Sequence, residues 1–255
     1  MKEVLSYIEA RQKTHERHKF FTELLDNTRL SGEERLAFAP CIVPFIMGYA
    51  DLNKYVFRNE SKEKRKDPVH AILNTHTYEE DFHWLWMLDD IARLNFNQKM
   101  SFSDAARVFW SPDMQMSRRL CLQLAALAAP AEPWGTLAVV ETCESFSITL
   151  FKHCQGIKLS NGDECEFFGS KHYIAETQHS IRDDSQTDQV SFQLTPAQRE
   201  EAKRLVDIAF NMFTDWFTSL YEYGTKYSSN QDRAYHQMID HSVNLPRRPS
   251  VPMAD

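Results

Sequence analysis

The sequence predicts an all-α protein that folds as a single domain. Glycine accounts for only 7 of the 255 residues, where average usage would give about eighteen. Such a chain has few of the tight turns that hairpins and phosphate-binding loops require. Apolar residues recur at helical spacing along almost the whole chain. No G-x-G-x-x-G or Walker-type loop is present, which argues against a dinucleotide-binding or P-loop enzyme.

Turn and cap residues divide the chain into segments that are each expected to be helical. Asp67 and Pro68 make an N-cap and a first helical position, which predicts one long helix that ends near residue 95. Pro40 and Pro44 lie in the first turns of a strongly apolar segment, where proline is tolerated best. The expected helices cover residues 2–26, 36–57, 68–95, 101–110, 114–128, 135–154, 165–181 and 195–223, with polar loops at 155–164 and 182–189.

The net charge and the amino-acid composition of the chain indicate which binding partners and which compartment to expect. The formal net charge is -7 and no long basic run is present, so nucleic acid is not expected as a partner. No apolar run reaches the roughly 20 residues that cross a bilayer, so no membrane association is expected. Five cysteines without a C-x-x-C pair suit reduced thiols in the cytoplasm. Residues 1–242 should form one helical domain, and 243–255 a disordered tail.

One pattern of potential metal ligands occurs twice: His, three residues, Glu, two residues, His. It reads HTYEEDFH at 76–83 and HYIAETQH at 172–179. Positions i, i+4 and i+7 of a helix fall within roughly 60° of one another, so each stretch should present two imidazoles and a carboxylate on one face. Such a face suits iron or manganese. Two Glu-x-x-His pairs in a helical bundle are typical of a di-iron centre.

A dinuclear centre needs further carboxylates. The apolar segment VVETCESF contains Glu141 and Glu144, and burying a carboxylate there is costly unless a cation meets it. Three residues apart, the two can share one helical face, and the periodicity leaves open which of them points inward. In the first motif, Glu79 is an alternative to Glu80 because both lie on the same broad face.

With these motifs, residues 36–225 resemble the haem-oxygenase-like di-iron oxidases and oxygenases. The resemblance implies a haem-oxygenase-like helical bundle that binds two Fe(II) ions where haem would sit. It also implies that Glu141 fits the spacing of the family's middle ligand better than Glu144. The implied ligands are Glu80, His83, Glu141, His172, Glu176 and His179, with Glu79 and Glu144 as alternates.

Other residues of the first motif have no ligand role in this family. The family requires only the Glu and the His there, so His76 is expected to be a hydrogen-bond partner of the site or a surface residue. Tyr78 and Phe82 lie nearest the expected ligand face and should line a substrate cavity.

The resemblance further implies an enzyme that uses O2 as co-substrate to oxidise a small carboxylate or amine, foremost an amino acid. The expected reactions are C–C or C–N cleavage, N-oxygenation or nitrile formation, with an external electron donor and a homodimer as further expectations. A carboxylate substrate would need a cation inside the bundle. The candidates are Lys54, Arg58, Lys152 and Arg182.

Three alternative functions stay open. A ferritin-like di-iron protein would need a Glu about thirty residues before the first motif, where only Asp51 is near. A haem-binding protein or haem oxygenase would need an N-terminal proximal histidine, for which His15 and His18 are candidates. A metal-free helical interaction protein would carry its histidines by chance.

Overall fold

The computed structural model describes residues 1–61, 67–179 and 192–227, the side chains of 178 and 179 excepted. Regular structure in this part of the chain is helical, apart from one antiparallel bridge between Lys158 and Glu164. The prediction of an all-α, single-domain fold is confirmed. The expected loop at 182–189, with Arg182, and the expected tail at 243–255 lie outside the described residues.

Most helices lie within the expected segments. The segments 2–26 and 36–57 each contain a helix followed by a π-helical turn, and the helix expected over 165–181 begins only at Ser170. In chain order the elements are α1 (Lys2–His15), η1 (Phe20–Leu25), α2 (Gly32–Arg35), α3 (Ala39–Leu52), η2 (Asn53–Phe57), α4 (Pro68–Glu79), α5 (His83–Arg93), α6 (Phe102–Trp110), η4 (Pro112–Met114), α7 (Gln115–Ala128), α8 (Pro133–Cys154), α9 (Ser170–His179) and α11 (Pro196–Tyr227).

Helix α8 is the centre of the bundle. Sixteen of its 22 residues are buried, because α1, α4, α7, α9 and α11 all pack against it. Its contact with α11 is built from aromatic rings, with Phe146 stacked on Phe213 at 4.0 Å between ring centroids. A helix enclosed in this way buries its whole circumference. None of the described helices combines the length and apolar character needed to cross a membrane.

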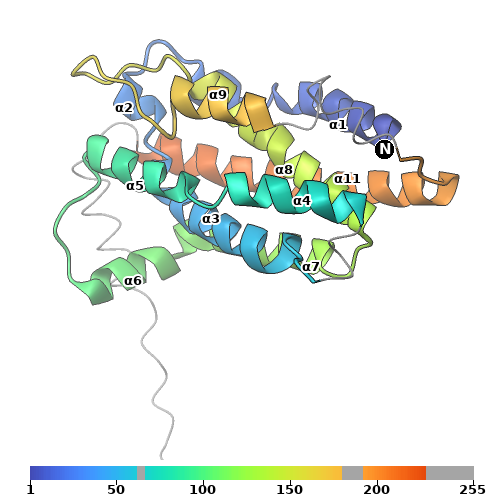
Figure 1. Ribbon diagram of the computed structural model, residues 1–255. Coiled ribbons are helices and arrows are strands. Elements are labelled where there is room, and N and C mark those ends of the chain that lie inside the picture. The colour runs from blue at the N-terminus through green and yellow to red at the C-terminus, as the bar shows by residue number, and fades with distance from the viewer. Residues whose placement is uncertain (62–66, 180–191, 228–255) are drawn as a thin grey trace, which may run out of the picture.

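The expected continuous helix over 68–95 is wrong, because the chain breaks at 80–82. In an unbroken helix the carbonyl of Thr77 would accept from the backbone N–H of Asp81. Instead the Arg58 guanidinium donates to that carbonyl at 2.7 Å and pairs with the Asp81 carboxylate at 2.6 Å. Helices α4 and α5 therefore lie end to end across the front of the bundle (Figure 1). Arg58 serves this break and is not available to a substrate.

A half-buried histidine makes the stability of this core sensitive to acid. The ring of His15 packs edge-on against Phe146 at 4.9 Å, and its Nε2 lies 2.8 Å from Thr214 Oγ1. Burial, followed by the positive charges of His18 and Arg11, lowers the pKa of His15 from 6.5 to about 4. The folded protein thus keeps this ring neutral where the unfolded chain binds a proton, and stability falls as the pH drops from about 6.5 to about 4.

We expect His15→Gln to reduce this loss of stability by about 1 kcal/mol at pH 4.5, after allowing for the partial exposure of the ring. The corresponding difference in melting temperature is about 2–4 °C, measured by circular dichroism at pH 7 and pH 4.5. Thr214→Val is the matched control, because it removes the contact but keeps the titrating ring. An equal pH dependence of wild type and His15→Gln would show that other groups cause the acid sensitivity.

Candidate metal centre

Six buried histidine and glutamate side chains meet beside α8, and each is at most 8% exposed. They form two groups, and within each group the potential ligand atoms lie within 4.8 Å of one another. The two groups adjoin, since Oε2 of Glu80 lies 3.0 Å from Nδ1 of His83. The first group is His76, Glu80 and Glu144, and the second is His83, His172 and Glu176.

The helix break decides how the first motif contributes to these groups. His76 and Glu80 lie at the end of α4 and belong to the first group, whereas His83 opens α5 and belongs to the second. The three residues therefore do not form the single ligand face that an unbroken helix would give. In the second motif, His172 and Glu176 are four residues apart on the uninterrupted helix α9 and lie in one group, as the helical spacing predicts.

His76 is part of the first group and not a surface residue. Its side chain is 3% exposed, and its Nε2 lies 3.2 Å from Oε1 of Glu144. Burial opposes a charge on this ring, but the carboxylates of Glu144, Glu80 and Glu141 outweigh it and raise the pKa of His76 from 6.5 to about 9. The same Oε1 of Glu144 accepts a hydrogen bond from the Tyr49 hydroxyl at 3.3 Å.

The second group is equally close-set. Nε2 of His172 lies 2.7 Å from Oε1 of Glu176 and 3.2 Å from Nδ1 of His83. Burial, together with the negative charges of Glu80 and Glu144, raises the pKa of Glu176 well above its usual value. The carboxylates of both groups therefore influence one another, and the six side chains act electrostatically as one site.

The negative charge of this site requires a counter-charge. Glu80, Glu141, Glu144 and Glu176 are all buried, and the ion pairs described for Glu144 and Glu176 are with histidines. An uncompensated buried carboxylate costs several kcal/mol. With all four carboxylates ionised and the imidazoles neutral, as in a metal-bound site, their charge is the one that two divalent cations would balance. Imidazole and carboxylate atoms at this spacing also match the coordination of an ion with bonds of about 2.0–2.2 Å, so the groups can hold metal ions.

The structure also shows where the alternative ligands, Glu79 and Glu144, lie. Glu80 is buried and Glu79 is exposed. Glu144 belongs to the first group, while Glu141, which the family spacing favoured, is buried one turn earlier on α8. The backbone of His179 ends α9, and its side chain lies outside the described residues.

An apolar cavity adjoins the two groups. The empty space among its side chains is about 570 Å³, including the part open to solvent, and about 40 Å³ of it admits the centre of a water molecule. None of the lysines and arginines in the described ranges lines it. Glu80, His83, His172 and Glu176 lie on its wall, together with aromatic and aliphatic residues from α3, α5, α8 and α11 that include Ile42, Phe45, Tyr49, Trp84, Phe146, Phe213 and Trp216.

Two residues expected to line the cavity do not. Phe82, at the helix break, is 68% exposed, and Tyr78 is 47% exposed, with its ring under the Arg58 guanidinium and its hydroxyl donating to Glu60. Tyr49 and Trp84 line the cavity instead. The sequence patterns did not predict Tyr49 as a cavity residue. A tyrosine within an otherwise apolar helix needs a polar partner for its hydroxyl, and this requirement could have indicated its place beside the site.

The residues proposed for the alternative functions lie elsewhere. Asp51, the nearest candidate for a ferritin-like ligand, is exposed on α3. His15 and His18 contact Thr214 and Thr218 of α11 and do not line the cavity. Of the described cations considered for a carboxylate substrate, Lys54 and Lys152 are exposed.

Glu176→Gln should stabilise the metal-free protein at neutral pH. Because the folded-state pKa of Glu176 is raised, the folded chain retains a proton that the unfolded chain loses above about pH 4.5, so stability decreases as the pH rises. Glutamine removes this loss, and we expect a melting temperature several degrees higher at pH 7.5 in EDTA, on the scale of about 1–3 kcal/mol.

The difference between wild type and Glu176→Gln should shrink towards pH 4.5. Glu200→Gln, an exposed position on α11, is the control and should change little at either pH. A lower melting temperature of Glu176→Gln at pH 7.5 would contradict the interpretation, because it would mean that the ionised carboxylate stabilises the empty site.

No family model matches the sequence, and a search of curated proteins found no significant match. The resemblance to haem-oxygenase-like di-iron enzymes stays a prediction, and the candidate metal centre stands on its own geometry: two adjoining buried groups of three His and Glu ligands.

Proposed function

We propose that this protein is an enzyme that uses a dinuclear iron centre and O2 to oxidise a small, largely apolar carboxylate or amine. The observation that supports the proposal is the pair of adjoining His/Glu groups, His76, Glu80 and Glu144 beside His83, His172 and Glu176. Mixed imidazole and carboxylate ligands favour iron or manganese over softer metals. The cavity against both groups gives a substrate access to them.

The protein side chains have distinct roles in this proposal. Two Fe(II) ions bound side by side would supply electrons to O2. Glu80 would help to hold both ions, because it belongs to one group and contacts His83 of the other. Tyr49 donates to Glu144 where the site meets the cavity, so its hydroxyl can hold a proton beside the reacting atoms. The surrounding aromatic residues exclude water, and an external electron donor completes the reaction.

The cavity also favours one kind of substrate within the expected class. A zwitterionic amino acid would bring a carboxylate and an ammonium group into a space that no described lysine or arginine lines and whose carboxylates, Glu80 and Glu176, belong to the ligand groups. A metal ion can bind one polar head group, but a second, unpaired charge would be costly to bury. We therefore favour a substrate with one coordinating head group and an apolar or aromatic body over an amino acid.

Anaerobic titration with Fe(II) and metal analysis tests the centre. We expect two Fe(II) ions per wild-type chain and a transient visible absorption band on mixing with O2 in a stopped-flow instrument. His172→Ala should lose at least one ion and the band. His153→Ala is the matched control, because His153 lies on α8 against Asp26, away from both groups. No iron uptake by the wild type, or a haem Soret band in the purified protein, would contradict the proposal.

The preference for a single head group is tested with a matched pair of ligands. 3-Phenylpropanoate and phenylalanine differ only in the α-ammonium group, whose unpaired burial costs several kcal/mol. We expect 3-phenylpropanoate to bind the anaerobic Fe(II) protein about 10-fold more tightly or better, followed through the fluorescence of Trp84 and Trp216 in the cavity wall. Ala50→Leu, which narrows the cavity, should weaken this binding and leave the iron content unchanged. Tighter binding of phenylalanine would favour an amino-acid substrate.

A further inference from the structure

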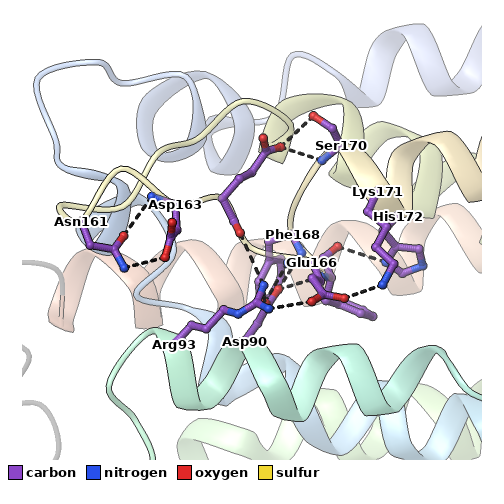
Figure 2. A network of polar contacts seen from close by, with 11 residues as sticks. Asp90, Arg93, Asn161, Asp163, Glu166, Phe168, Ser170, Lys171 and His172 are labelled. Carbon is purple, nitrogen blue, oxygen red and sulfur yellow. Dashed lines mark hydrogen bonds and ion pairs between the residues drawn. The ribbon is translucent and has the colours of Figure 1, made fainter.

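A buried aspartate of α5 anchors the chain segment that leads into α9. Asp90 is fully buried, and its carboxylate accepts three backbone hydrogen bonds (Figure 2). Glu166 N–H donates to Oδ1 at 2.8 Å, while Phe167 and Phe168 N–H donate to Oδ2 at 2.7 and 3.0 Å. Hydrogen bonds to an ionised acceptor are the strong ones. This segment is therefore fixed to α5 two to four residues before α9 begins.

One peptide group of this segment connects Asp90 with a histidine of the metal centre. The peptide between Phe167 and Phe168 donates its N–H to Asp90 and accepts, at its carbonyl, a hydrogen bond from Nδ1 of His172 at 3.0 Å. A carbonyl oxygen can only accept, so Nδ1 of His172 carries a proton. The other ring nitrogen, Nε2, faces Glu176 and His83, which is the orientation a metal ligand needs.

The same helix carries a ligand of the second group. His83 and Asp90 are seven residues apart on α5, which places them on nearly the same side of the helix. Helix α5 thus supplies one residue of the second group, His83. Through Asp90 and the Phe167–Phe168 peptide, the same helix also orients His172, which comes from α9. The path from Asp90 to His172 runs through one peptide and includes no residue of the first group.

We propose that Asp90 is a positioning residue for the second metal site, acting on His172 through the Phe167–Phe168 peptide. The negative carboxylate polarises the peptide, strengthens its carbonyl as an acceptor and so fixes the tautomer of His172 that presents Nε2. Metal-binding histidines are commonly oriented by a carboxylate or a carbonyl; here one peptide joins the two. The inference rests on the proposed metal centre. It assigns Asp90 to the second of the two proposed metal sites.

Anaerobic Fe(II) titration of Asp90→Asn tests the proposal. We expect one ion to bind with wild-type affinity and the other to bind about 10–100-fold more weakly, the range for residues that orient a ligand. Glu166→Gln is the matched control, because it alters ion pairs to Arg93 and Lys171 on the same segment but leaves the Asp90 hydrogen bonds in place. Wild-type affinity at both sites of Asp90→Asn, or equal weakening of both, would overturn the assignment.

The tautomer of His172 is a second readout that needs no iron. In metal-free wild-type protein at pH 8, ¹⁵N spectra should show Nδ1 of His172 protonated, and Asp90→Asn should shift the ring towards the Nε2-protonated form. An unprotonated Nδ1 in the wild type would overturn the proposal even if the variant does not fold. If the wild type takes up no iron, the proposed function fails, while the tautomer comparison still decides the role of Asp90.

Discussion

The burial of four carboxylates around α8 is the constraint on which the rest of this structure depends. Glu80, Glu141, Glu144 and Glu176 lie in a bundle whose other contacts are largely apolar and aromatic, so their ionised forms are costly. The ion-pair partners described for Glu144 and Glu176 are imidazoles, which can release a proton and bind a metal. Arginine or lysine partners would neutralise the site permanently. The choice of histidine leaves the charge for a cation to balance, and natural proteins accept such a loss of stability where a site requires it.

The arrangement of the two groups depends on where α4 ends. Arg58 takes the Thr77 carbonyl that the next helical turn would need, so α5 starts afresh at His83 and points its imidazole at α9. An unbroken helix would have directed His76, Glu80 and His83 to a single ion. The break instead divides them between two adjoining groups of potential ligands. It also turns Phe82 to solvent and brings Trp84 to the cavity.

The sequence predicted most of the helical segments and named the His and Glu residues that the structure brings together, because both depend on local spacing. Helical periodicity gave the all-α fold, and Asp67 caps α4 as expected. The helix break could not be predicted, since it depends on an arginine nineteen residues before the carbonyl it binds. The sequence also could not decide between Glu141 and Glu144. Helix α8 is buried on almost all sides, so the periodicity of its apolar residues does not show which side faces the site. The cavity, whose wall comes from α3, α5, α8, α9 and α11, has no sequence pattern of its own.

Long-range contacts thus decide what local patterns leave open, and Asp90 shows why they matter for the chemistry. The second motif supplies His172 and Glu176 at helical spacing, but spacing alone does not determine which ring nitrogen faces the site. That is fixed by the Phe167–Phe168 peptide and, through it, by a carboxylate on another helix. Neither Phe167 nor Phe168 is a polar residue, and their contribution is made entirely by the backbone. The contact that orients His172 is therefore made by a buried peptide group and not by a polar side chain. Buried peptide groups must find hydrogen-bond partners within the protein, and here those partners are Asp90 and His172.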